Sequence, residues 1–101
     1  MSRYFLSTQA KYDLREIKNY IARDNLAAAR RFVETFRDQC NLIAKSPRMG
    51  RSYEELAPGL RGFAIGNYII FYRPIENGIA VERLLSGYRD REAIFSEDGD
   101  S

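Results

Sequence analysis

LRGFAIGNYIIFYRPIENGIAVERLL, the stretch at residues 60–85, contains three runs of β-branched and aromatic residues separated by two turn signals. The first turn is Gly66-Asn67, and the second holds Asn77-Gly78, a pair that readily takes positive φ at both positions. The runs predict strands at residues 60–65, 68–73 and 79–85. We therefore expect a three-stranded antiparallel meander.

The middle run, residues 68–72, is apolar or aromatic at every position. Successive side chains of a strand point to opposite faces, so both faces of this strand are apolar. Two helices can hardly cover both sides of the sheet in so small a domain, so we expect helices on one face and a partner on the other. Tyr68, Ile70 and Tyr72 are assigned to the partner face. The alternative is a partly exposed aromatic face that has no partner.

The residues before the meander predict one strand and a helical hairpin. Residues 4–6 form the first strand, and Ser7 or Thr8 caps a helix over residues 8–23. Asn25 caps a second helix, which ends near Lys45-Ser46 because Pro47 disfavours helical geometry in the residue before it. One apolar stripe runs along each helix, formed by Ala10, Leu14, Ile17 and Ile21 in the first and by Ala29, Phe32, Val33, Phe36, Cys40 and Ile43 in the second. The predicted fold class is α+β.

The segment after the second helix and the C-terminus carry weaker signals. Proline and glycine punctuate residues 46–59, which predicts a loop between the hairpin and the meander. Residues 88–95 predict a short C-terminal helical turn whose Ile94 and Phe95 pack onto the body. Residues 96–101 are small and acidic and predict a frayed tail. The domain is therefore expected to span residues 1–95.

The charge of the chain indicates an anionic partner. Thirteen of the sixteen basic residues are arginine, whose planar fork suits carboxylate and phosphate groups. The net charge is +2, but Glu97, Asp98 and Asp100 lie in the last five residues, so the preceding chain carries +5. This composition favours an acidic protein or a nucleic acid and does not choose between them.

The absence of histidine excludes several kinds of chemistry. Without histidine the chain has no Ser-His or Cys-His nucleophile pair and no zinc site of the usual Cys/His kind. Cys40 lies on an apolar stripe and is expected to be a core residue. Glu54 and Glu55 are adjacent, so their side chains diverge and do not form an acid/base pair. We expect no cofactor and no metal. The chain shows no signal-type segment and no run of 18 apolar residues, which predicts a cytoplasmic protein without a membrane span.

Three clusters of residues resemble the ParE/RelE toxin superfamily, and in particular its ParE-like branch. The first is the hairpin pattern from Ala10 to Ala29, and the second is Ser46-Pro47-Arg48-Met49-Gly50-Arg51. The third comprises residues of the meander and the segment after it, namely Gly59, Leu60, Arg61, Tyr68, Ile70, Phe71, Tyr72, Arg73, Arg83, Gly87, Tyr88, Arg89 and Asp90.

This resemblance implies a toxin of a type II toxin–antitoxin system. A ParD-like antitoxin would neutralise it by wrapping a disordered C-terminal segment around the toxin, in a hetero-oligomer. The ParE branch poisons DNA gyrase by binding it and trapping its cleaved-DNA state, without enzymatic activity. The RelE branch instead cuts messenger RNA in the ribosome, and its catalytic cluster would correspond here to Arg61, Arg83 and Tyr88. Glu54 and Glu55 stand where that branch is lysine-rich, which favours the gyrase alternative and leaves the nuclease as the second one.

Two sets of site residues follow. Arginine and tyrosine are enriched at interface hot spots, so the target-binding set is Arg61, Arg73, Arg83, Tyr88 and Arg89. The antitoxin-binding set is Tyr68, Ile70 and Tyr72 on the sheet and Tyr20 on the hairpin, where a helix or an added strand could dock. We expect no specific DNA binding by the toxin alone. In a third interpretation Arg61, Arg73, Arg83 and Arg89 are structural and pair with Glu54, Glu82 and Asp90.

Overall fold

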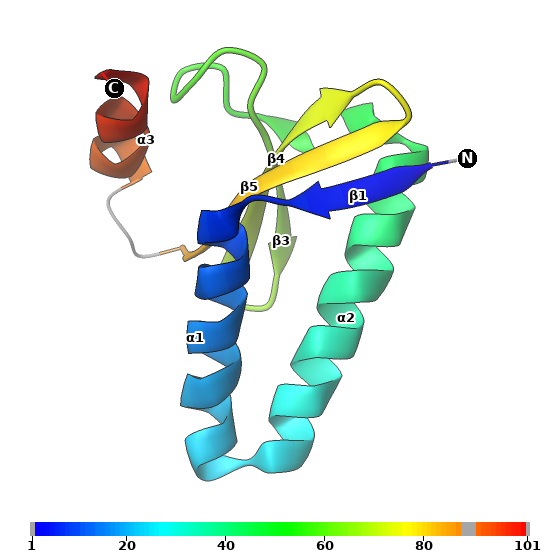
Figure 1. Cartoon of the computed structure of the whole chain (residues 1–101), viewed down its shortest axis with the longest axis vertical. Coiled ribbons are helices and arrows are strands. Elements are labelled where there is room, and N and C mark those ends of the chain that lie inside the picture. Colours follow the sequence, from blue (N-terminus) through cyan, green and yellow to red (C-terminus); the bar gives the residue numbers. More distant parts are fainter. Residues whose placement is uncertain (1, 88–90, 101) are drawn as a thin grey trace.

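A five-stranded sheet with a long helical hairpin on one face forms the body of the protein (Figure 1). The computed structural model describes residues 2–87 and 91–100, and the side chains within them up to residue 95. In chain order the elements are β1 (Arg3–Leu6), α1 (Thr8–Asp24), α2 (Leu26–Lys45), the 3₁₀ turn η1 (Pro47–Met49), β2 (Arg51–Ser52), β3 (Arg61–Ile65), β4 (Tyr68–Ile75), β5 (Gly78–Ser86) and α3 (Arg91–Asp100).

The predicted meander is present as β3, β4 and β5, and two short strands extend it. The strand order is β1-β5-β4-β3-β2, with β1 parallel to β5 and all other pairs antiparallel. The second hairpin turns one residue earlier than predicted, because Ile75 pairs with Gly78 and leaves Glu76 and Asn77 as its tip. Asn77 has a φ of 70°, as expected for the turn. A bulge in β5 leaves Glu82 without a residue opposite it in β4.

Side-chain caps fix the starts of both helices of the hairpin, and a backbone hydrogen bond closes the end of the first helix. The Ser7 hydroxyl accepts a hydrogen bond from the Ala10 amide at 2.9 Å, and the Asn25 side chain accepts one from Ala28 at 3.0 Å. The Asn25 amide also donates to Ile21, so this one residue ends α1 and begins α2. The predicted caps and the predicted end of the second helix at Lys45 are confirmed.

The sheet has a core on each face. On one face Ile70 and Tyr72, together with Ile79, Val81 and Leu84 of β5, pack against Phe36 and Cys40 of α2. On the other face Phe71 lies at the centre of a second cluster, in edge contact with Tyr53 and Phe95 at 5.1 Å between ring centroids in both cases. The chain therefore covers both apolar faces of β4 by itself.

The assignment of Ile70 and Tyr72 to an exposed partner face is wrong. Both side chains have no exposed surface, because they point toward the helices. The opposite face of β4, away from α1 and α2, is formed by the odd-numbered residues Ile69 and Phe71. In a strand, alternate residues point to opposite faces. Because residues 68–72 are apolar at every position, the sequence does not show whether the even-numbered or the odd-numbered side chains face the helical hairpin.

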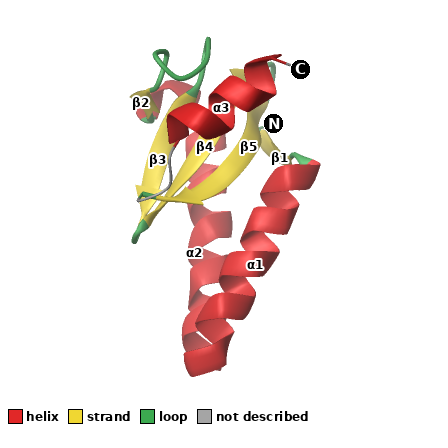
Figure 2. Cartoon of the chain, turned by 90° about the vertical axis from the view of Figure 1, so that its left-hand side faces the viewer, coloured by secondary structure: helices red, strands yellow, loops and turns green. Residues whose placement is uncertain are grey.

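The C-terminal helix is longer than predicted. α3 spans ten residues, where we expected a short helical turn and then a frayed tail from residue 96. Phe95 is buried and Ile94 half-buried against the second cluster, as predicted. Figures 1 and 2 show α3 on the face of the sheet away from α2.

The helical hairpin extends well beyond the sheet (Figures 1 and 2). α2 has 20 residues and is about 30 Å long at 1.5 Å per residue, whereas the central strand β4 has eight residues. The part of the hairpin near Asn25 therefore has no sheet beneath it. Within the described residues, no helix is long and apolar enough to cross a membrane.

Gly78 is required where β1 joins the sheet. A Cβ atom at this position would lie 1.7 Å from the carbonyl oxygen of Arg3, and φ is +148°. We predict that Gly78→Ala displaces β1 and lowers the free energy of unfolding by at least about 3 kcal/mol in urea denaturation. Gly66→Ala is the control, since Gly66 has a φ of +57° and nothing within 4 Å of its Cβ position. It should cost only about 1 to 2 kcal/mol, and equal losses would contradict the prediction.

Candidate functional site

A nearly buried ion pair joins the helical hairpin to the sheet. Arg83 Nε of β5 donates to Asp13 Oδ2 of α1 at 2.8 Å, and Arg83 Nη2 donates to Oδ1 at 3.2 Å. The two side chains are 12% and 9% exposed. Asp13 Oδ2 also accepts the backbone N–H of Leu84 at 3.0 Å. The Asp13 carboxylate therefore satisfies both a guanidinium fork and a backbone group of a sheet edge.

Arg83 thus has a structural role in the folded chain. It was predicted to contact the target or, in a nuclease, the scissile phosphate. The observed fork is instead directed to Asp13, a partner that the sequence reasoning did not name. The only signal for it was that Asp13 is a carboxylate next to an apolar stripe, which also describes many exposed helix residues.

Arg73 has a similar but more exposed role. Its Nη1 donates to both carboxylate oxygens of Glu82, at 2.9 and 3.0 Å, and its Nε donates to the Pro58 carbonyl at 3.1 Å. The pairing of Arg73 with Glu82 confirms that part of the structural interpretation. Both side chains are 34% exposed, so the pair is only partly withdrawn from water.

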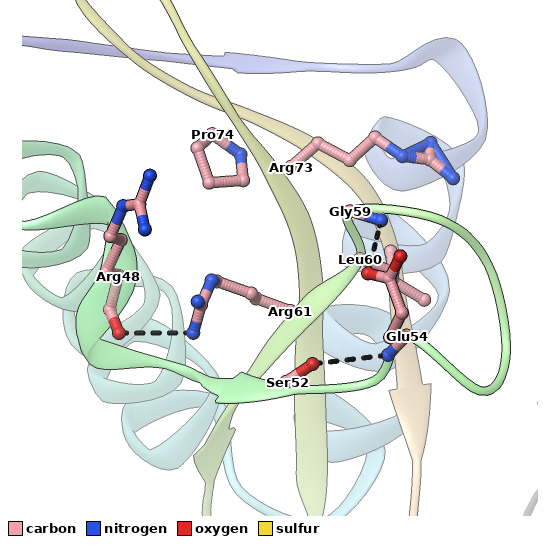
Figure 3. Close-up of a pocket in the computed structure, with 8 residues that line it drawn as sticks. All are labelled: Arg48, Ser52, Glu54, Gly59, Leu60, Arg61, Arg73 and Pro74. Atoms are coloured by element: carbon pink, nitrogen blue, oxygen red, sulfur yellow. Dashed lines mark hydrogen bonds between the residues drawn. The ribbon is translucent and has the colours of Figure 1, made fainter.

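Three arginines line a small open pocket at the end of β3 (Figure 3). We call it the arginine pocket. Its volume is about 280 Å³, and it is lined by Arg48, Ser52, Glu54, Gly59, Leu60, Arg61, Arg73 and Pro74. Arg61 Nη1 donates to the carbonyl oxygens of Gly50 at 2.7 Å and Arg48 at 3.2 Å, which orients its guanidinium group. Glu54 is turned to the loop backbone, because its Oε2 accepts the Gly59 N–H at 2.7 Å.

Tyr72 holds one wall of this pocket in place. Its hydroxyl donates to the Pro47 carbonyl at 2.7 Å and accepts the Gly50 N–H at 3.0 Å. Burial raises the pKa of the Tyr72 hydroxyl, opposed by the Gly50 hydrogen bond and the Arg61 charge. Tyr72 was predicted to bind the antitoxin. It is instead an internal anchor for the turn that carries Arg48.

Arg48 is the site residue that the sequence reasoning missed. It lies in η1, between Pro47 and Gly50, and its side chain is exposed. Residues 46–59 read as a loop, and a single arginine in a loop has no periodicity to indicate where it points. The pocket brings Arg48 together with Arg61 and Arg73, two of the residues predicted to bind the target. Tyr88 and Arg89, also predicted to bind the target, lie outside the described residues.

A second hollow lies on the helical hairpin, and we call it the hairpin groove. Its volume is about 430 Å³, and half-buried or buried apolar side chains, Ala22, Ala29 and Val33, lie at its base. Its remaining lining residues are Lys18, Asn19, Leu26, Arg30, Glu34 and Arg37. Three cations and one carboxylate therefore surround an apolar base, and Leu26 is 58% exposed.

The other two predicted antitoxin-binding residues have different surroundings. Tyr20 is 64% exposed on α1 and does not line the hairpin groove. Tyr68 is half-buried and makes an edge contact with Phe32 at 5.4 Å between ring centroids. Of the three tyrosines predicted to bind the antitoxin, Tyr72 is thus an internal anchor, Tyr68 lies at the edge of the core and Tyr20 is exposed.

Cys40 is a core residue, as predicted. It has no exposed surface, and burial raises the pKa of its thiol to about 12. The thiol is therefore protonated at neutral pH and does not act as a nucleophile in the folded chain.

Comparison with known proteins decides the family. The sequence model described as "ParE toxin of type II toxin-antitoxin system, parDE" matches residues 4–91. The chain belongs to the ParE toxin family. It is 34% identical to Toxin ParE1 of Mycobacterium tuberculosis H37Rv over 86 residues, which is 83% of this chain and 88% of the relative. It is 35% identical to Toxin ParE1 of Caulobacter vibrioides over 83 residues, 81% of this chain and 83% of the relative.

A solved structure supports the fold of this ParE-family chain. The structure described as "Chromosomal ParDE TA system from P. aeruginosa" superposes with a TM-score of 0.69. The match covers 85% of this chain and 96% of that chain at 18% identity. The α+β architecture expected from the sequence is thereby confirmed.

The two ion pairs of this ParE-family chain should differ in their contribution to stability. Asp13→Ala removes the carboxylate that accepts from Arg83 Nε, Arg83 Nη2 and the Leu84 N–H, so we expect a loss of about 3 kcal/mol or more. Glu82→Ala breaks the more exposed pair with Arg73 and should cost about 1 kcal/mol or less. Urea denaturation followed by circular dichroism measures both. Equal losses would show that Asp13 does not have the role described.

Proposed function

We propose that this chain inhibits DNA gyrase by binding it and trapping its cleaved-DNA state. The observation that carries the proposal is the engagement of Arg83 by Asp13. A nuclease that used Arg61, Arg83 and Tyr88 would need Arg83 directed at a phosphate, and breaking a nearly buried ion pair to release it is costly. Membership of the ParE family supports the same conclusion.

The ribosome-dependent nuclease is the second candidate, and one observation favours it. Arg48 and Arg61 converge on one open pocket, and convergent guanidinium groups can stabilise the charge of a phosphate in a transition state. The pocket is also lined by Glu54, which would oppose an approaching phosphate. A purely binding role therefore agrees better with the charges.

We further propose that a ParD-like antitoxin neutralises the toxin by placing an amphipathic helix in the hairpin groove. The apolar base provides area to bury, and Lys18, Arg30 and Arg37 outnumber Glu34 at its rim. The complementary ligand is a helix with small apolar residues on one face and acidic residues beside them. A neighbouring short reading frame that encodes a DNA-binding N-terminus and such a tail would identify the antitoxin.

The target is tested by giving the purified toxin separately to two systems. We expect loss of supercoiling when gyrase acts on relaxed plasmid, with accumulation of cleaved plasmid, and an intact defined message on translating ribosomes. Addition of the antitoxin should restore supercoiling, which controls for a contaminating nuclease. Message cleavage at fixed codon positions with normal supercoiling would contradict gyrase inhibition and support the ribosome-dependent nuclease.

The hairpin groove is tested by reversing charge at its rim. The double variant Arg30→Glu with Arg37→Glu should weaken antitoxin binding about tenfold or more in calorimetry, because it places two carboxylates against an acidic helix. Arg31→Glu is the matched control, since Arg31 is exposed on the same helix and does not line the groove. If the control weakens binding as much as the double variant, the groove is not the docking site.

A further inference from the structure

We propose that the arginine pocket is a carboxylate-binding site that receives one acidic side chain from an extended segment of the antitoxin. This inference rests on the proposed neutralisation by an antitoxin. It adds a second contact, of different chemistry, to the helix in the hairpin groove. The argument starts from the hydrogen-bonding capacity of the arginines that line the pocket.

Two of the three arginines keep most of their hydrogen-bonding capacity for a ligand. Arg73 donates through Nε to the Pro58 carbonyl and through Nη1 to the Glu82 carboxylate, which leaves only its Nη2 group. Arg61 donates only through Nη1, to two carbonyl oxygens, so its Nε and Nη2 make no hydrogen bond within residues 2–87 and 91–100. The Arg48 guanidinium makes no hydrogen bond or ion pair with the same part of the chain. The free capacity is therefore concentrated on Arg48 and Arg61.

These two groups are held on a rigid support. The Arg48 turn is fixed to the core by the Tyr72 hydroxyl, which contacts both Pro47 and Gly50. The space beside Gly50 is filled, since a Cβ atom there would lie 2.3 Å from the Tyr72 hydroxyl oxygen. The Gly50 carbonyl in turn orients the Arg61 fork. A fork fixed before binding loses less conformational entropy when it takes a planar carboxylate.

The strands beside the pocket favour an extended peptide as the carrier of that carboxylate. β3 begins at Arg61, opposite Tyr72, whereas β4 continues through Arg73 and Pro74 to Ile75. These last three residues of β4 pair with β5 and have no strand partner in β3. Pro74 is exposed and Ile75 is 40% exposed. An extended segment can lie along this edge and direct a side chain toward Arg61.

The charges around the pocket favour a single carboxylate over a nucleic-acid strand. Glu54 lines the pocket and Glu55, also exposed, follows it in the chain. A phosphodiester chain carries a charge at every nucleotide and would pass close to these two carboxylates. One acidic side chain can bind on the Arg48 side of the pocket, whereas Figure 3 shows Glu54 on the other side beside Gly59, whose N–H it accepts. The volume of about 280 Å³ also suits one side chain rather than a helix.

The experiment compares Arg48→Gln with Arg51→Gln in the full chain. Arg51 is also exposed, but its guanidinium carbon lies over the Tyr53 ring, 5.0 Å from the ring centroid, and it does not line the pocket. We expect Arg48→Gln to weaken binding of the cognate antitoxin about tenfold or more, and Arg51→Gln to leave it unchanged within about twofold. Neutralising one acidic residue of the antitoxin's extended segment should produce the same loss and no further loss in combination with Arg48→Gln. Full affinity of Arg48→Gln would overturn the inference.

A second measurement tests whether the arginine pocket binds a carboxylate, and its result does not depend on the antitoxin proposal. The full chain is titrated with sodium acetate against sodium chloride at equal ionic strength, followed by the NMR signals of Arg61 Nε–H and the amides of Ser52 and Leu60. We expect saturable shifts with acetate only, absent in Arg48→Gln and retained in Arg51→Gln. Absence of acetate shifts in the unsubstituted chain would overturn the inference, whatever the antitoxin does. So would Arg48-dependent binding of a short DNA duplex without an acetate response, which would assign the pocket to nucleic acid.

Discussion

The contact between the Asp13 carboxylate and the edge of β5 determines how the two halves of this chain fit together. β1 covers β5 only as far as Val81, so the edge of β5 from Glu82 onward needs another partner. Ser7 provides part of it, since its amide donates to the Val81 carbonyl and its hydroxyl to the Glu82 carbonyl. Asp13 then accepts the Leu84 N–H one and a half turns into α1. The start of α1 thus replaces the missing strand and fixes the helix against the sheet.

The exposed hairpin groove follows from this attachment. α1 is fixed near its N-terminus, and both helices are longer than the strands beneath them, so the end of the hairpin near Asn25 extends past the sheet. Apolar residues such as Ala29 and Val33 then line a hollow with no sheet below it. The same geometry that makes the core compact at one end leaves an apolar surface at the other. Three basic residues and one acidic residue also line this hollow, so its surroundings favour an acidic over a basic ligand.

Local signals in the sequence predicted the elements well, and long-range pairing decided what the sequence could not show. The caps at Ser7 and Asn25 and the stop before Pro47 are local, so they could be predicted. Whether Ile70 and Tyr72 are buried depends on which face of β4 α2 covers. The sequence does not show this, because residues 68–72 are apolar at every position. The role of Arg83 depends on Asp13, 70 residues away in the sequence. The sequence indicated only part of the arginine pocket. Arg61 stands in a predicted strand, whereas the turn that carries Arg48 is held by the Tyr72 hydroxyl, which donates to the Pro47 carbonyl.

The positions of the two hollows constrain the kind of partner that could fill both. Figure 1 shows the tip of the hairpin at one end of the long axis and the η1, β2 and β3 segments toward the other, along an extent of 37 Å. A small compact domain would cover one of them and leave the other open. A chain with a short amphipathic helix followed by an extended acidic segment reaches both, because an extended residue spans about 3.3 Å. Such a chain pays its ordering entropy only on binding, so each contact must be specific to offset that cost. The apolar base of the groove and the fixed fork of Arg61 meet that requirement in different ways, one through buried area and the other through oriented hydrogen bonds.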